Sequence, residues 1–181
     1  MDELVDILDS KGNPTGRTAL KSEAHKKGLF HPTIHVWFYT KNGEVLLQQR
    51  GKTKITFPLL WDVSVAGHIG AGETIENAAL REVNEEIGIQ IQQDKLEKIT
   101  VLKKKVKHDN GIWDREYIHV FLYLLDENTL LTKQDSEVEA LKWISLKEFE
   151  TLIENEDENL VPTAKERHLS IVKTIASRIR I

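Results

Sequence analysis

Three glutamates with the spacing of a metal site stand close together in one short segment of the chain. Glu82, Glu85 and Glu86 are spaced i, i+3 and i+4, so on a helix they would lie on one side. Like charges at this spacing destabilise a helix unless a positive group lies among them. A hard divalent cation, which prefers oxygen ligands, is the simplest such group. The spacing therefore predicts a helix whose carboxylates hold a metal ion.

A glycine-rich loop leads into this helix, in the sequence GHIGAGETIENAALREVNEEIGI over residues 67–89. Gly67 is followed after five residues by Glu73, and after seven more by Arg81-Glu82 and the rest of REVNEEIGI. The pattern resembles the Nudix box, the signature of Nudix hydrolases, at every specified position. The alternative interpretation is a solvated, charged helix face.

The resemblance implies roles for the residues of the box. Glu82, Glu85 and Glu86 would bind Mg²⁺ or Mn²⁺, and the Gly67 carbonyl would add a ligand. Cleavage of a diphosphate moves charge onto phosphate oxygens, which a bound cation neutralises while it activates water.

Two further residues of the box, Glu73 and Arg81, would form an ion pair that braces the loop against the helix. Their removal is expected to affect folding as well as activity. A merely structural charge pair would be compatible with the same role.

A second set of possible metal ligands is dispersed along the chain, and comprises His25, His31, His68, Asp114 and Glu116. Asp114 and Glu116 are spaced i, i+2, so on a strand they face the same side. Three imidazoles and two carboxylates suit a transition metal. Taken singly, each histidine also suits a helix end, a turn or a half-buried strand.

Taken together, these residues resemble the metal ligands of isopentenyl-diphosphate isomerases, which are members of the Nudix superfamily. The resemblance extends from about Ala24 to Ile144. It implies that Arg50 and Lys54 bind the substrate diphosphate, a role that suits a bidentate guanidinium and a point charge. Lys54 could instead be a solvated loop lysine.

One position departs from the isomerase pattern. Ala66 stands where the isomerases have a cysteine immediately before the Gly-His pair, and the chain has no cysteine. Isomerisation needs a proton donor and a proton acceptor, and a methyl group can be neither. The sequence therefore favours a Nudix hydrolase of the isopentenyl-diphosphate isomerase-like subgroup. Its substrate would be a nucleoside diphosphate or a related X-linked diphosphate.

Two alternative functions stay open at this point: an isopentenyl-diphosphate delta-isomerase, and a non-catalytic module that senses a nucleotide or sugar phosphate. The general base is also open among Glu82, Glu86 and Glu116. Trp113 could stack on a base or an isoprenoid, or be a core or rim tryptophan.

Composition limits the remaining possibilities. The chain of 181 residues is 40% hydrophobic, which predicts a single domain over residues 1–181. Its net charge of −4 does not indicate a nucleic-acid binder. The N-terminus lacks the features of a signal peptide, and no apolar run approaches roughly 20 residues. We expect a cytoplasmic protein with a small-molecule diphosphate substrate, no nucleic-acid or membrane partner, and an undetermined oligomeric state.

The predicted fold is α/β (α+β), and the resemblance narrows it to a Nudix-type α/β/α sandwich with a mixed sheet between helices. An N-terminal hairpin (about 3–20) and a C-terminal helix (about 162–180) are expected as appendages. Turn and cap signals predict the remaining elements. These are helices over 21–27, 74–87 and from 146, strands over 34–39, 45–50, 61–66, 96–106, 117–125 and 138–144, and a polar loop over 107–116.

Overall fold

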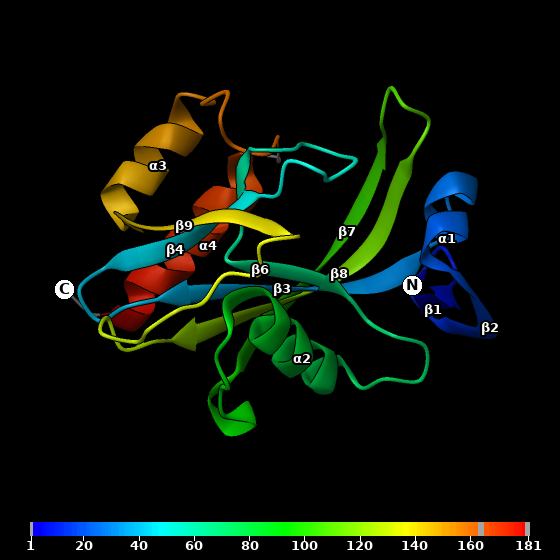
Figure 1. The fold of residues 1–181 in the computed structure, drawn as a ribbon, viewed down its shortest axis with the longest axis horizontal. Coiled ribbons are helices and arrows are strands. Elements are labelled where there is room, and N and C mark those ends of the chain that lie inside the picture. The colour runs from blue at the N-terminus through cyan, green and yellow to red at the C-terminus, as the bar shows by residue number, and fades with distance from the viewer. Residues whose placement is uncertain (1, 163–164, 180–181) are drawn as a thin grey trace.

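The computed structural model describes residues 2–162 and 165–179. The parts of the expected C-terminal helix at residues 163–164 and 180 lie outside this range. In chain order (Figure 1) the elements are β1 (Leu4–Leu8), β2 (Pro14–Leu20), α1 (Lys21–Lys27), β3 (His31–Tyr39), β4 (Glu44–Arg50), β5 (Trp61–Asp62), β6 (Val65–His68), α2 (Ile75–Ile87), the 3₁₀ helix η1 (Gln93–Lys95), β7 (Glu97–Lys107), β8 (Trp113–Leu124), β9 (Val138–Ser145), α3 (Leu146–Glu154) and α4 (Lys165–Ile179).

A mixed sheet forms the centre of the molecule, with strand order β5-β4-β3-β8-β7. β3 pairs with β8 in parallel along its whole length, from His31 opposite Glu116 to Tyr39 opposite Leu124. The other pairings in this sheet are antiparallel. The parallel pair places the beginnings of β3 and β8, and therefore a histidine and a glutamate of the second ligand set, side by side.

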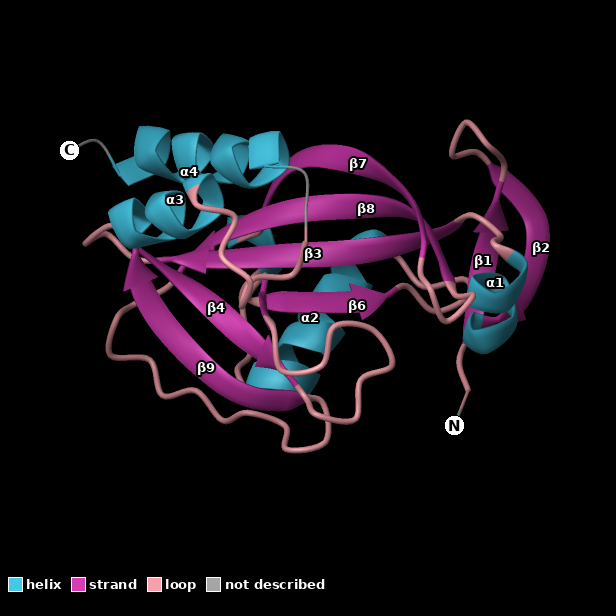
Figure 2. Ribbon diagram, turned by 90° about the horizontal axis from the view of Figure 1, so that it is seen from above, coloured by secondary structure: helices cyan, strands magenta, loops and turns pink. Residues whose placement is uncertain are grey.

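The sheet divides along the other edge of β3. β6 pairs with residues 33–36 of β3, whereas β4 meets β3 only where Val45 lies opposite Tyr39. β4 continues away from β3 and pairs with β9 and β5. Figure 2 shows β4 and β9 diverging from β3 and β6. This divergence lets side chains from α2 reach toward the opposite face of the sheet.

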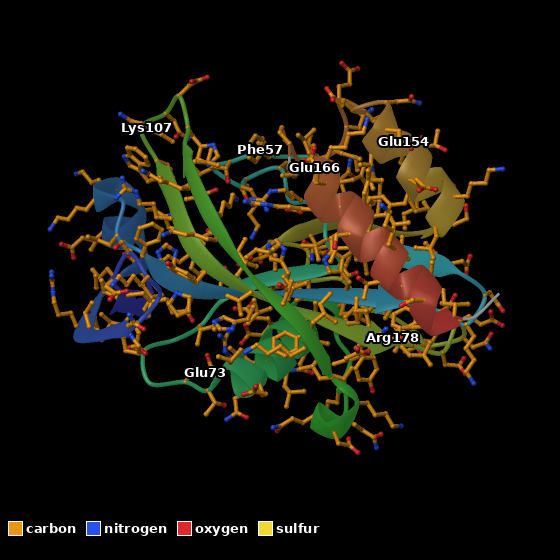
Figure 3. The ribbon with its side chains drawn as sticks, turned by 180° about the vertical axis from the view of Figure 1, so that it is seen from behind. Phe57, Glu73, Lys107, Glu154, Glu166 and Arg178 are labelled. Atoms are coloured by element: carbon orange, nitrogen blue, oxygen red, sulfur yellow. The ribbon has the colours of Figure 1, made fainter. Side chains whose placement is uncertain are left out.

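Helices cover both faces of the sheet, which confirms the predicted α/β/α sandwich. Alternate residues of β3 explain this, because Ile34 and Phe38 pack in the cluster that contains α2, whereas Trp37 packs in the cluster that contains α3 and α4. Figure 3 shows α4 crossing the back of the sheet, with Glu166 near its beginning and Glu73 on the side of α2.

Local signals set the ends of two helices as predicted. Thr74 precedes α2 and accepts a hydrogen bond from the Asn77 amide at 3.3 Å, and Gly88 ends the helix with a φ of 71°. Gly28 ends α1 with a φ of 62°.

Two expected elements differ from the structure. The strand expected over 61–66 is two strands, because Ser64 donates to the Leu46 carbonyl and accepts from the Phe38 amide, which bends the chain between β5 and β6. The loop expected over 107–116 is shorter, because β8 begins at Trp113, opposite Lys107 of β7. Asp114 and Glu116 therefore lie on a strand.

The hairpin of β1 and β2 packs against the glycine-rich loop that precedes α2. The Ala71 amide donates to the Leu4 carbonyl at 2.8 Å, and the Gly72 amide donates to the Asp6 carboxylate at 2.9 Å. The hairpin thus satisfies backbone donors of the loop from the outside. Among the described residues, no helix combines the length and hydrophobicity needed to span a lipid bilayer.

Candidate active site

One guanidinium connects the loop before α2 with the carboxylates of the helix. Arg81 donates two hydrogen bonds to Glu73, at 3.1 and 2.9 Å, and one each to Glu82 at 2.9 Å and Glu85 at 3.1 Å. It also donates to the His68 carbonyl at 3.0 Å. Arg81 therefore fixes the loop, and offsets the repulsion among the helix carboxylates.

Gly67 lies in direct contact with the Glu82 side chain. A Cβ atom at Gly67 would lie 2.0 Å from Cδ of Glu82, closer than atoms can approach. Burial raises the pKa of Glu82, and the neighbouring Arg81 opposes that shift. The close contact places the Gly67 backbone and the Glu82 carboxylate together, as a shared metal ligand set requires.

Glu86 lies behind Glu82 and is 3% exposed. Its carboxylate accepts from the Gln48 side chain at 2.8 Å and from the Ala66 amide at 3.3 Å. Burial raises the pKa of Glu86 to about 8, against the effect of the Gln48 hydrogen bond. The Glu86 carboxylate therefore lies where β4 and β6 diverge, in contact with both strands. The contact with Gln48 was not predicted from the sequence.

A cavity of about 1,230 Å³ opens beside these residues, on the face of the sheet that α4 covers. Glu82, Glu85 and Gly67 line it, as do Arg50 and Lys54. This volume suits a small-molecule ligand.

Both expected diphosphate-binding cations are at this cavity, each beside a carboxylate. Arg50 pairs with Asp62 at 3.2 Å, and Lys54 pairs with Glu137. Lys54 is therefore held in place by a specific partner and is not a free loop lysine. Lys21 and Lys104, which the sequence analysis did not single out, also line the cavity and add positive charge.

The fold brings four of the five expected second-site ligands together. One ligand atom from each of His25, His31, His68 and Glu116 lies within 4.8 Å of the others. Nε2 of His25 and Nε2 of His68 are 3.0 Å apart, and the rings of His31 and His68 stack with centroids 5.3 Å apart. Nε2 of His31 is buried with no hydrogen-bond partner among the described residues. These converging lone pairs fit a metal ion better than they fit one another.

The charge states of His31 and His68 agree with this fit. Burial lowers the pKa of His31 to about 4 and the pKa of His68 well below its usual value. Burial also acts to lower the pKa of His25, but its interactions with Asp114, the Trp113 carbonyl and Glu116 together outweigh burial, and the pKa is raised. Neutral imidazoles are the form that ligates a metal.

Asp114 is not a member of this four-residue group. Its carboxylate takes a hydrogen bond from His108 at 2.8 Å and pairs with Lys104 at 2.8 Å, while His25 Nδ1 lies 3.4 Å away. It therefore supports His25 from behind. Lys104 was detectable in principle, because strand alternation places Leu102 and Lys104 on the inward face of β7.

The structure does not place Trp113 on the wall of the cavity. Its ring lies against Arg115, with the guanidinium carbon 4.5 Å from the ring centroid, and beside Lys107 at 5.3 Å. Its backbone carbonyl accepts from Nδ1 of His25 at 2.9 Å. The rim position, which was the alternative, is the one that the geometry favours.

Known proteins share this sequence pattern and this fold. The NUDIX domain family matches residues 29–164. Nudix hydrolase 3 of Arabidopsis thaliana is 35% identical over 166 residues, which cover 89% of this chain but 22% of that longer protein. Isopentenyl-diphosphate Delta-isomerase 2 of Photorhabdus laumondii is 33% identical over 155 residues, covering 86% of this chain and 84% of the relative. The crystal structure of a Deinococcus radiodurans protein has a TM-score of 0.72 at 18% identity, covering 93% of this chain and 98% of that one.

The chain belongs to the Nudix superfamily, as the box predicted, and its relatives include proteins named as isopentenyl-diphosphate isomerases. It is an enzyme of the Nudix hydrolase class, which confirms the expected type of activity. The structural likeness, at its low identity, adds support for the fold alone.

The contact between Gly67 and Glu82 yields a first prediction. Gly67→Ala should displace Glu82 and lower metal affinity by about tenfold or more, the scale seen when a group that orients ligands is lost. Gly70→Ala is the matched control, because a Cβ there would be 3.4 Å from Glu73 and needs little adjustment. Metal titration calorimetry on both variants measures the difference. Equal affinities would contradict the contact.

Glu86 yields a second prediction, on the pH dependence of metal binding. Because its pKa in the metal-free fold is about 8, above its ordinary 4.5, metal must displace a proton below pH 8. Mg²⁺ affinity should therefore fall by about tenfold per pH unit below 8 and level off above it. Because Glu86 ionises at a lower pH in the unfolded chain than in the fold, the free energy of unfolding of the metal-free protein should fall as pH rises from 4.5 to 8.

Calorimetric titrations at several pH values on either side of 8 test this dependence. Glu86→Gln should bind more weakly and with a flatter pH dependence. A wild-type affinity that does not change with pH would show that Glu86 is not a ligand.

Proposed function

We propose that the protein is a divalent-metal-dependent pyrophosphohydrolase. It cleaves a diphosphate bond in a nucleoside diphosphate or a related X-linked diphosphate, by attack of water at phosphorus. The single observation that carries this proposal is the placement of Glu82 and Glu85, two of the three helix carboxylates of the box, at a cavity that also holds Arg50 and Lys54.

In this proposal Glu82, Glu85, Glu86 and the Gly67 carbonyl hold Mg²⁺, or Mn²⁺. The bound cation supplies charge neutralisation on the phosphate oxygens and activation of water. Oxygen ligands from three carboxylates and a carbonyl match what such hard cations prefer. Arg81 keeps the carboxylates in position before the ion arrives.

Arg50 and Lys54 bind the diphosphate from the other wall of the cavity. Their carboxylate partners, Asp62 and Glu137, fix where each cation points. The substrate is a small molecule, because the cavity has room for a ligand of that size.

The general base is assigned to the box, and within it to Glu82. Glu82 lines the cavity and has a raised pKa, as a base that works near neutral pH needs. Glu116 also lines the cavity and burial raises its pKa, so it is the second candidate. Glu86 is the least suited, because it does not line the cavity and its Oε2 already accepts from both Gln48 and the Ala66 amide.

The second metal site is proposed at His25, His31, His68 and Glu116, with Asp114 as a support for His25. Three nitrogen ligands and one oxygen ligand favour a transition metal over Mg²⁺. The buried, unpartnered nitrogen of His31 is the feature that a bound ion would satisfy.

Isopentenyl-diphosphate isomerisation is the alternative function, and the relatives named as isomerases favour it. The described residues of the cavity include Ala66 where the isomerase pattern has its cysteine. A proton donor would have to come from another residue, such as Lys104, whose ammonium nitrogen lies 3.8 Å from the Glu116 carboxylate. Hydrolysis needs no such replacement.

The third prediction concerns the box carboxylates. Glu85→Gln should lower metal-dependent phosphate release by on the order of 10²-fold or more, because one charge that holds the cation is removed. Glu76→Gln, on the first turn of the same helix, is the control and should keep wild-type rates. The assay follows released phosphate and the second product over a panel of diphosphates with Mg²⁺ and with Mn²⁺.

The same panel separates the other functions. Conversion of isopentenyl diphosphate to its dimethylallyl isomer would support the isomerase. Tight binding of a nucleotide or sugar phosphate with no turnover would support a sensing module. Unchanged hydrolysis in both Glu85→Gln and Glu86→Gln would contradict the proposed mechanism.

The fourth prediction concerns the histidine cluster. His68→Asn should reduce the number of bound transition-metal ions per chain by one, measured by elemental analysis after dialysis. His119→Asn is the matched control, because His119 lies outside the cluster and should retain the wild-type metal content. The same metal content in both variants would exclude a site at the cluster.

A further inference from the structure

The cavity continues beyond the proposed metal sites toward α4. One face of β3 lines it with alternate residues, so His35 and Trp37 follow Thr33 along the same wall. Asp62 of β5 and His168 of α4 line the same region. His35 lies opposite Ala66 in the pairing of β3 with β6, so this region adjoins the segment that carries Gly67.

Two imidazoles in this region have no hydrogen-bond partner among the described residues. Neither His35 nor His168 makes a hydrogen bond with another described residue, although both line the cavity. The ring of His168 is held in place by Trp37, at a centroid distance of 5.8 Å, and by Phe149 at 5.6 Å. Its orientation is thus set by packing, as in a preformed binding site.

Both imidazoles are neutral at pH 7. Burial lowers the pKa of His35 to about 4 and also lowers the pKa of His168, with the charge of Asp62 opposing both shifts. A neutral imidazole offers one donor and one acceptor. The two rings together therefore present two donors and two acceptors to a ligand.

A carboxylate adds a further acceptor at a fixed place. One oxygen of Asp62 pairs with Arg50 at 3.2 Å, and the other accepts from the Val63 amide at 2.8 Å. Burial acts to raise the pKa of Asp62, but the charge of Arg50, together with the Val63 hydrogen bond and smaller charge effects, outweighs burial and lowers the pKa. Each oxygen retains accepting capacity toward the cavity.

The other walls of this region are apolar and comprise Leu102, Ile118, Val120 and Ile171. A hydrocarbon chain could fill the space between them. It would, however, bury the imidazoles of His35 and His168 with their hydrogen-bonding groups unsatisfied, which is the costly outcome. A compact ring with hydrogen-bonding edges would satisfy both the apolar walls and the polar groups.

We propose that His35 and His168, together with the Asp62 carboxylate that Arg50 holds, form a selectivity subsite for the non-phosphate group of the substrate. That group is a compact ring with hydrogen-bond donors and acceptors, as in a nucleobase or a sugar, and is not an isoprenoid. The assignment rests on the proposed diphosphate hydrolysis, since the diphosphate places this group in the cavity.

Binding measurements test the subsite independently of turnover. Isothermal titration with Ca²⁺ in place of Mg²⁺ compares adenosine and cytidine diphosphates, phosphoribosyl diphosphate, dimethylallyl diphosphate and inorganic pyrophosphate. Wild-type protein should bind a ring-bearing ligand at least tenfold more tightly than dimethylallyl diphosphate. Preference between the nucleotides and the sugar diphosphate shows which ring the subsite takes.

Variants on two different elements locate the effect. His168→Phe and His35→Leu should each weaken the preferred ring-bearing ligand by on the order of 10–100-fold and alter pyrophosphate binding much less. Ser170→Ala, on the exposed side of α4, is the control for the helix and should bind like wild type.

Tighter wild-type binding of dimethylallyl diphosphate would overturn the subsite, even if a variant failed to fold. Equal losses for ring-bearing ligands and pyrophosphate would overturn it as well, as would no binding of any ring-bearing ligand. Ring-selective binding that depends on His168, combined with no hydrolysis under Mg²⁺, would contradict the proposed hydrolase and leave the subsite standing.

Discussion

The arrangement of the site depends on the guanidinium of Arg81. Three carboxylates and a backbone carbonyl converge on it, from both the glycine-rich loop and α2. Without this positive charge, Glu82 and Glu85 would repel each other within one turn of helix. Glu73 would also lose the ion pair through which it holds the loop against α2. The bidentate contact with Glu73 fixes the direction of the guanidinium, and through it the two helix carboxylates. For the proposed metal site, this means that Glu82 and Glu85 are already in position before a cation binds.

The divergence of β4 from β3 gives the carboxylates of α2 access to the cavity. α2 packs on one face of the sheet, while the cavity lies on the other, so the helix could not reach the cavity through a continuous sheet. Because β6 replaces β4 beside the first half of β3, Glu82 can contact Gly67 and Glu86 can accept from Gln48 and Ala66. The same division places the histidine cluster at the beginnings of β3 and β8. Both candidate metal sites therefore open on a single cavity.

The position at which the chain departs from the isomerase pattern, Ala66, is paired with a cavity histidine. Ala66 and His35 lie opposite each other on adjacent strands, next to the Gly-His pair that begins the box. The alanine removes the side chain on which a proton could be carried, and the histidine adds a hydrogen-bonding group to the wall. Activity and substrate are set by such site residues and not by the fold that carries them.

The sequence by itself determined the elements whose signals are local. The spacing of Glu82, Glu85 and Glu86, the cap at Thr74 and the stop at Gly88 all depend on residues within a few positions of each other, so α2 and its chemistry could be predicted. The tertiary structure decided what depends on strand pairing. Register decided that Asp114 pairs with Lys104 and His108, that Trp113 lies outside the cavity, and that residues 113–116 are strand and not loop. Packing of α4 decided that His168 meets His35 in one cavity, although 133 positions separate them in the chain (168 minus 35). Such contacts join residues from distant parts of the chain, and no periodicity in the sequence encodes which strand or helix will lie opposite another.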